Sequence, residues 1–377
     1  MAIRMFSPVK REALLAGLMG IGALLVGFFS LANITAINAV QWLLIASGLW
    51  CFVWWELWRR VELNRADAES APYSRLGLAN NLTLVRGGLI ALTGGFLLQP
   101  QATGLVGWIP GVLYTIAAIL DRVDGFVARR TKRTSILGSE LDTVYDALGL
   151  LVAPLLAVGY GKIHWSFLLV SAAYYIFVWG LYWRGKHNLP VYPLMPSMLR
   201  RTLAGFQMGL VALVLLPCFH APFTIIVAVA FTLPILLGFM VDWLVVSGRI
   251  RAELAHNQQF FNRLAVFSRN IFQPCLRLVL CIALAIFVYT FDALPSIILL
   301  GSLLLLGGVI LLGLAGRVGA VAILALLGFI HKAQPIDATI TILIFSSAWL
   351  TLLGTGRFSL WQWDDHWVNR RDGENTQ

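Results

Sequence analysis

The chain has 377 residues, of which 59% are hydrophobic and only 12% are charged. These proportions exceed what the core of a soluble protein of this length needs, so they exclude a soluble globular protein and indicate a polytopic membrane protein. The formal net charge of +10 does not indicate a nucleic-acid partner, because the basic residues gather in short loops, where they set membrane topology and contact anionic lipid headgroups.

Apolar segments along the chain predict an all-α fold with about twelve transmembrane helices. In chain order they lie near residues 13–31, 40–58, 81–98, 102–120, 141–160, 163–183, 202–219, 223–245, 273–291, 294–314, 318–331 and 338–354. Two leading helices occupy residues 1–60, and a core of six helices occupies residues 78–246. The polar stretch 247–271 is expected to form an interfacial helix that links two bundles, and four helices follow over residues 272–377.

Basic residues distinguish the two sides of the membrane. If residue 1 lies in the cytoplasm, nearly all loop arginines and lysines fall on the cytoplasmic side, and only Lys162 and Lys332 fall on the other. This asymmetry is what the positive-inside rule predicts for an even number of spans. We therefore expect an integral membrane protein of the cell inner membrane with both termini in the cytoplasm.

Four aspartates lie where the fourth apolar segment ends and the fifth begins: Asp121, Asp124, Asp142 and Asp146. The first two are spaced i,i+3 and the last two i,i+4, so each pair lies on one face of its helix. The stretch between the pairs is too short to cross the membrane, so both pairs lie at the same depth, and two facing helices can present four carboxylates to one volume. Charged groups in a bilayer are costly and are usually functional, so this cluster is the predicted site, on the cytoplasmic side.

Four carboxylates a few Å apart need cations or protons to coexist. Oxygen ligands favour Mg²⁺ or Mn²⁺, and no His or Cys lies near enough to suggest zinc. Because Mg²⁺ shares its coordination sphere with substrate phosphates, the expected ligand is a diphosphate. Gly125 lets a backbone approach closely, Ala128 keeps the same helix face narrow, and Arg129 offers a planar fork to phosphate oxygens.

One pattern resembles the motif of the CDP-alcohol phosphotransferases, also called CDP-alcohol phosphatidyltransferases. All eight specified positions match: Asp121-x2-Asp124-Gly125-x2-Ala128-Arg129-x8-Gly138-x3-Asp142-x3-Asp146. The upstream segment 79–86, ANNLTLVR, is similar to the family's P-N-x-L-T-x-x-R opening, with Ala79 where proline is usual. The resemblance covers roughly residues 78–246.

The resemblance implies an enzyme of phospholipid biosynthesis. It would transfer a phosphatidyl or substituted-phosphate group from a CDP-alcohol, above all CDP-diacylglycerol, to an alcohol acceptor, with release of CMP. Asp121, Asp124 and Asp142 would hold two Mg²⁺ or Mn²⁺ ions, and Asp146 would contact one ion and serve as general base. A carboxylate between cations is a weak base, so the base is expected on the rim of the site.

The resemblance also implies the residues that bind the donor and support the motif. The CDP-binding residues would be Gly125, Arg129, Asn80, Thr83 and Ser135, while Ala128 and Gly138 are structural positions of the motif. An ordinary helix N-cap accounts equally well for Asn80 and Thr83, and a topology signal is the alternative for Arg129. The family precedent suggests a homodimer.

An anionic acceptor would need basic groups on the same side of the membrane. Lys186, Arg200 and Arg201 form the available cluster. Asp242 would either orient these groups or be a snorkelling residue at its helix end. The alternative for this cluster is again a topology signal.

Two other function classes are weighed against the enzyme. A cation transporter would use the aspartates as an ion path and show Gly/Pro-broken helices repeated in two halves, and no such repeat is found. A non-enzymatic membrane scaffold with a decayed motif would have lost at least one aspartate, and none is lost.

The last four predicted helices lie outside the resemblance. The segment 354–360 is faintly similar to the end of small four-helix membrane proteins of the DoxX type. We expect an accessory or oligomerising role for this block. The tail with Trp361, Trp363 and Trp367 beside Asp364 and Asp365 is expected to lie on the membrane surface, and a partner-binding tail is the alternative.

Overall fold

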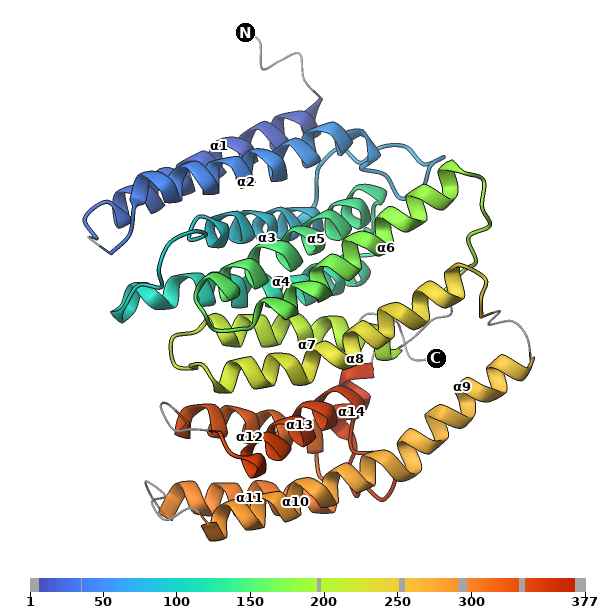
Figure 1. Ribbon diagram of the computed structural model, residues 1–377. Helices are drawn as coiled ribbons and strands as arrows, with labels where there is room; N and C mark the ends of the chain where they lie inside the picture. Colours follow the sequence, from blue (N-terminus) through green and yellow to red (C-terminus); the bar gives the residue numbers. More distant parts are fainter. Residues whose placement is uncertain are drawn as a thin grey trace. The chain divides into compact units, whose positions relative to one another are not determined.

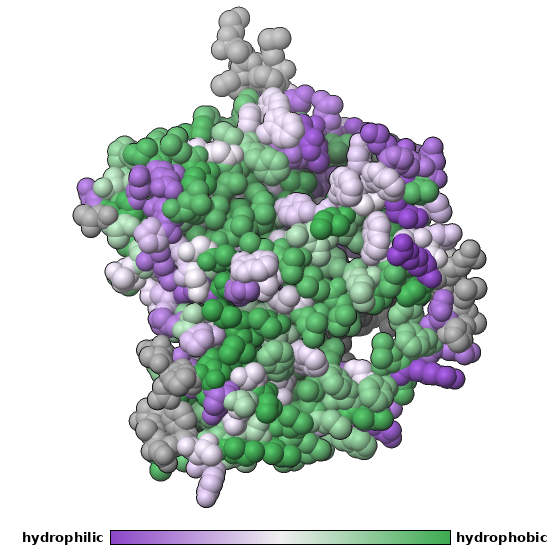
Figure 2. Space-filling view, in the orientation of Figure 1, coloured by the Kyte–Doolittle hydropathy of each residue, from purple (hydrophilic) through white to green (hydrophobic). Residues whose placement is uncertain are grey.

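A computed structural model describes residues 7–34, 36–194, 198–250, 255–290, 297–331 and 336–369. This part of the chain is helical and contains no β-strand, which confirms the predicted all-α class. Each of the twelve predicted apolar segments coincides with a helix. Seven helices in the described ranges are long and apolar enough to cross a membrane, so the count of about twelve spans stays a prediction. Apolar side chains cover most of the face shown in Figure 2.

The described chain divides into two compact units. Unit 1 holds the described residues up to Lys162 together with Met208–Pro217. Its helices are α1 (Pro8–Leu31), α2 (Ala39–Arg60), η2 (Val61–Leu63), α3 (Leu78–Gly94), η3 (Gly104–Trp108), α4 (Ile109–Arg130) and α5 (Ile136–Gly159). Helix α7 (Met198–Leu215) contributes residues to both units.

Unit 2 holds Ile163–Gln207 and the described residues from Cys218 to Asn369. Its helices are η4 (Trp165–Phe167), α6 (Leu168–Lys186), α8 (Phe223–Val246), α9 (Ala255–Phe267), η5 (Ser268–Phe272), α10 (Gln273–Thr290), α11 (Ile297–Leu312), α12 (Gly316–Ile330), α13 (Ala338–Leu353) and α14 (Trp363–Asn369). The unit boundary falls inside the predicted core 78–246, and the predicted domain division stays a prediction.

Glycines on α1 let it pack closely against tryptophans on α2, and Figure 1 shows the two helices side by side. A Cβ atom on Gly20 would lie 2.0 Å from Trp50, and one on Gly27 would lie 2.4 Å from Trp42. The indole N–H of Trp50 donates to the Gly17 carbonyl over 3.3 Å. Close backbone approach at small residues is the usual way for membrane helices to associate. The two leading helices therefore form one closely packed hairpin.

This hairpin is anchored to the helix that bears two of the aspartates. Tyr145 on α5 is fully buried, and its hydroxyl donates to the Val53 carbonyl of α2 over 2.8 Å. Gly87 on α3 lies beside both residues, because a Cβ there would be 2.8 Å from Val53 and 3.0 Å from Tyr145. The contact holds α2, α3 and α5 in fixed register next to Asp146.

Residues 255–271 of the polar stretch predicted to be an interfacial linker belong to a helix that continues into the next apolar segment. Helix α9 continues through a π-helical turn, η5, directly into α10. Residues Asn257–Thr290 form one uninterrupted helical segment. A π turn keeps backbone hydrogen bonds in place, so the polar sequence does not end the helix.

The buried Arg317 holds the C-terminal segments of unit 2 together. Arg317 at the start of α12 pairs with Asp365 and donates to the carbonyls of Thr351 and Leu352 over 2.7 and 3.0 Å. The buried carboxylate of Asp364 accepts from the Arg317 backbone N–H over 2.6 Å. The predicted surface tail is thus docked on α12 through its acidic residues. The rings of Trp361 and Trp363 stay exposed, and the side chain of Trp367 lies outside the described residues.

Candidate functional site

The two aspartate pairs lie on α4 and α5, whose ends are joined by a short turn. Asp121 and Asp124 belong to the last turns of α4, and Asp142 and Asp146 to the first turns of α5. Ser135 ends the turn as the N-cap of α5, where its hydroxyl accepts from the Gly138 N–H over 3.0 Å. Asp121, Asp142 and Asp146 each present an oxygen within 4.8 Å of the others. The convergence predicted from helix periodicity is therefore present.

A buried arginine on α3 lies at the centre of these carboxylates, and the sequence analysis gave it no role beyond its place in the segment 79–86 that resembles the family's opening. The guanidinium of Arg86 is 0% exposed and pairs with Asp121. It also lies 2.7 Å from Asp142, 3.3 Å from Asp146 and 3.7 Å from Asp124. A lone charge within an apolar segment is costly enough to mark it as functional, and that signal could have identified Arg86.

Arg86 offsets only part of the charge of the cluster. Four carboxylates around one guanidinium leave a formal net charge of −3. Each of the four aspartates has an oxygen within 4.0 Å of an Arg86 nitrogen, so the four carboxylates share one cation. An all-oxygen donor set with excess negative charge fits hard divalent cations such as Mg²⁺ or Mn²⁺.

The aspartates of α5 are accessible, whereas Asp124 of α4 is buried against α3. The side chains of Asp142 and Asp146 are 48% and 42% exposed, whereas that of Asp124 is 7% exposed. Thr83 donates a hydrogen bond of 2.8 Å to Asp124. Asp124 is thus the anchored member of the cluster, and Asp142 and Asp146 lie at its accessible rim.

Asn80 joins three segments next to the cluster. Its amide group donates to Asn64 Oδ1 over 3.0 Å, to the Leu76 carbonyl over 2.9 Å and to Ser135 Oγ over 3.1 Å. Asn64 is itself fully buried and was missed by sequence reasoning. The N-cap of α3 is Gly77, so neither Asn80 nor Thr83 is the helix cap that was the alternative. Both side chains instead reach other helices or loops of unit 1.

The two glycines of the motif make room for neighbouring polar side chains. A Cβ on Gly125 would lie 3.1 Å from Arg129 Nη1, so the arginine side chain folds back over this glycine on an exposed face of α4. Ala128, also on α4, is partly exposed. A Cβ on Gly138 would lie 2.6 Å from Asn80 Oδ1. Glycine at 138 is therefore required for the contact between Asn80 and the start of α5.

Replacing Gly138 by alanine is expected to lower stability by about 1–3 kcal/mol, because the new methyl group must displace Asn80 from Ser135. Thermal unfolding of the purified protein in detergent measures the effect. Gly159→Ala in the same helix is the matched control, since a Cβ there meets no atom within 4 Å. Equal melting temperatures for the two variants would contradict this explanation of Gly138.

The predicted acceptor cluster belongs to unit 2. Arg200 on α7 forms two hydrogen bonds with Asp242 on α8, of 2.6 and 2.7 Å. Asp242 therefore orients this arginine, as expected. Lys186 is exposed at the end of α6, and the side chain of Arg201 lies outside the described residues.

One comparison with known proteins found a match. The family model for CDP-alcohol phosphatidyltransferases matches residues 76–312, more than half of the chain. The match includes the four aspartates and Arg86, and it extends past the predicted end of the core at residue 246 as far as α11. No curated protein and no solved structure matched the chain.

Proposed function

We propose, because this chain belongs to the CDP-alcohol phosphatidyltransferase family, that it transfers a phosphatidyl or substituted-phosphate group to an alcohol and releases CMP. CDP-diacylglycerol is the proposed donor, which places the reaction in phospholipid biosynthesis. The observation that supports the proposal best is the set of four carboxylates around Arg86, whose excess negative charge suits cations bound to a diphosphate.

Two Mg²⁺ or Mn²⁺ ions are proposed to bind Asp121, Asp124, Asp142 and Asp146. When bound, such ions would neutralise charge on the phosphoryl oxygens of the donor. The arrangement of Asp121, Asp142 and Asp146 supports this assignment, since one oxygen of each lies within 4.8 Å of the others. Asp124 would hold its oxygen in place through the hydrogen bond from Thr83.

Asp146 is proposed to be the general base. It would accept the proton of the acceptor hydroxyl as that oxygen forms a bond to the β-phosphorus and the bond from this phosphorus to the CMP oxygen breaks. Its exposure of 42%, on the open side of the cluster, supports access by an acceptor. The proposed donor-binding and acceptor-binding residues would orient the acceptor hydroxyl and the β-phosphorus for this step.

The donor nucleotide is proposed to contact Gly125 and Arg129, with Asn80, Thr83 and Ser135 beside it. Arg129 is supported by its position over Gly125 on an exposed helix face, where a guanidinium can form a bidentate contact with phosphate. Asn80 and Ser135 would act by holding the start of α5, since they bond to each other.

The acceptor is proposed to approach from the cytoplasm, where Lys186, Arg200 and Arg201 would attract an anionic group. The distribution of basic residues in the loops supports this orientation and location in a cell inner membrane. A homodimer is proposed from family precedent.

The class of reaction is tested by CMP release. Purified protein is incubated with CDP-diacylglycerol, Mn²⁺ or Mg²⁺ and a panel of acceptor alcohols. Release that requires both the cation and one acceptor is expected, and it would identify the acceptor. Absence of release with CDP-diacylglycerol and also with CDP-amino-alcohol donors would count against the proposed function.

Changing Asp146 to asparagine is expected to remove turnover while sparing donor binding. Asparagine keeps the shape of the side chain but does not accept the hydroxyl proton, so CMP release should fall by about 10²–10⁴-fold. Turnover is followed by CMP release and binding by equilibrium titration with CDP-diacylglycerol. Asp67→Asn, in the exposed loop before α3, is the control. Normal CMP release by Asp146→Asn would remove the base assignment.

A further inference from the structure

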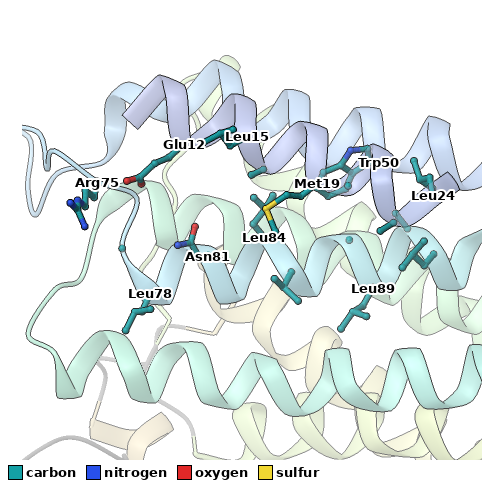
Figure 3. A pocket seen from close by; sticks show the side chains of 18 of the residues that line it. Glu12, Leu15, Met19, Leu24, Trp50, Arg75, Leu78, Asn81, Leu84 and Leu89 are labelled. Atoms are coloured by element: carbon teal, nitrogen blue, oxygen red, sulfur yellow. The ribbon is translucent and has the colours of Figure 1, made fainter. Parts of the chain in front are cut away.

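A groove lies on unit 1 beside α1, α2 and α3. These helices line this groove of about 750 Å³, most of which is apolar (Figure 3). Leu15, Met19 and Leu24 line it from α1, Trp50 from α2 and Leu84 from α3. The family match begins at residue 76, so α1 and α2 lie before it. The groove is thus a feature that the two leading helices add to the family core.

One end of the groove is charged. Glu12, Arg75 and Asn81 lie together at that end in Figure 3, and Arg133 also lines the groove. The Glu12 carboxylate is engaged, since it accepts from the Leu76 backbone N–H over 2.8 Å. The Arg75 side chain is exposed and forms no ion pair with the described residues. Two guanidinium groups against one engaged carboxylate leave this end suited to an anion.

Arg133 is held in place at the same end. Its Nη2 donates to the Arg75 carbonyl over 2.8 Å, and its guanidinium lies 4.8 Å from the centre of the Tyr73 ring. Its Nε is buried and has no hydrogen-bond partner among the described residues. These contacts fix the guanidinium at this end of the groove, and a positioned guanidinium is a good partner for a phosphate.

The length of the groove matches one leaflet of a membrane. Glu12 and Leu24 mark its ends along α1, and twelve residues of helix rise by about 18 Å. Half of a bilayer hydrocarbon core is about 15 Å. A transmembrane helix from another protein would need a groove about twice as long, so the dimensions favour a lipid.

The groove and the aspartate cluster lie on opposite faces of α3. At 100° per residue, Asn80, Thr83 and Arg86 lie on one side of the helix, and Asn81, Val85 and Gly88 lie on the other. A lipid in the groove is therefore separated from the carboxylates by the body of α3. A lipid in the groove would contact α3, the helix that holds Arg86, and would not reach the aspartate cluster as a substrate.

We propose that this groove binds one anionic phospholipid that is not a substrate. Its acyl chain lies along α1 and α3, and its phosphate contacts Arg75 and Arg133. Bound there, the lipid fills the space between the leading hairpin and α3. The choice of an anionic headgroup rests on the two guanidinium groups, and the choice of a lipid rests on the apolar lining and its one-leaflet length.

Native mass spectrometry of the delipidated full chain tests the proposal. The protein is incubated with phosphatidylglycerol or phosphatidylcholine of the same acyl chains, and the fraction with one retained lipid is measured. We expect retention of phosphatidylglycerol at energies that remove phosphatidylcholine. Arg75→Glu should lower this retention by about tenfold, because it places a negative charge beside the phosphate.

A substitution that fills the groove provides a second, independent test. Ala16→Trp places a large ring in the groove, whereas Leu18→Trp on the same helix points to an exposed face that does not line it. Lipid retention should be lost in the first variant and kept in the second. Should Ala16→Trp not fold, Arg75→Glu still decides the outcome, because its side chain is exposed.

Three results would overturn the proposal. The first is equal retention of the two lipids, or retention that none of the variants alters. The second is displacement of phosphatidylglycerol by CDP, which carries no acyl chain, because this would make the groove part of the donor site. The third is a lipid-free dimer that Ala16→Trp separates, which would assign the groove to a second copy of the chain.

Discussion

Replacing Asp121 by asparagine is expected to reduce metal-dependent CMP release by about 10³-fold or more. Asp121 pairs with Arg86 and belongs to the group of three carboxylates whose oxygens lie within 4.8 Å of one another. Asparagine preserves the shape of the side chain but removes one negative charge and one anionic ligand. The affinity for the divalent cation should therefore fall together with the rate. Direct titration with Mn²⁺ separates the two effects.

The matched control is the same substitution at Asp337, the N-cap of α13 in unit 2. Asparagine caps helices as well as aspartate does, so Asp337→Asn should keep both folding and CMP release. If Asp121→Asn keeps wild-type activity and Mn²⁺ affinity, the cluster is not the metal site. Loss of activity with unchanged Mn²⁺ affinity would restrict the role of Asp121 to its pair with Arg86.

Replacing Arg86 by methionine is expected to destabilise the protein by about 3–5 kcal/mol when divalent cations are absent. The substitution keeps a side chain of similar length but leaves four carboxylates without their central positive charge. Mn²⁺ or Mg²⁺ should restore much of this stability, because a cation that binds only the folded state stabilises it. Thermal unfolding in detergent with Mn²⁺ and with a chelator measures both effects.

Arg317→Met separates this effect from the general cost of losing a buried arginine. Arg317 is buried, and it contacts two carboxylates, Asp364 through its backbone N–H and Asp365 through its side chain, where Arg86 has four around its side chain. The variant should lose stability that added Mn²⁺ does not restore. An Arg86→Met protein that melts at the same temperature with and without Mn²⁺ would show that Arg86 is not the counter-charge of a metal site.

The packing of the two leading helices could not be predicted from the sequence. Their apolar composition predicted two helices and nothing more. Their packing depends on which glycines of α1 meet which tryptophans of α2, as at Gly20 and Trp50. No pattern within either helix states that pairing. The groove beside α3 follows from it, so only the folded chain showed the groove.

The sequence by itself determined the helical class, the positions of the helices, the family and the two aspartate pairs. Each of these depends on residues close together in the chain: apolar runs, the i,i+3 and i,i+4 spacing, and a motif within 26 residues. Only the tertiary structure decided that Arg86 lies at the centre of the carboxylates and that Asn80 bonds to Asn64 and Ser135. These contacts join separate helices or loops, whose register and rotation follow from side-chain packing.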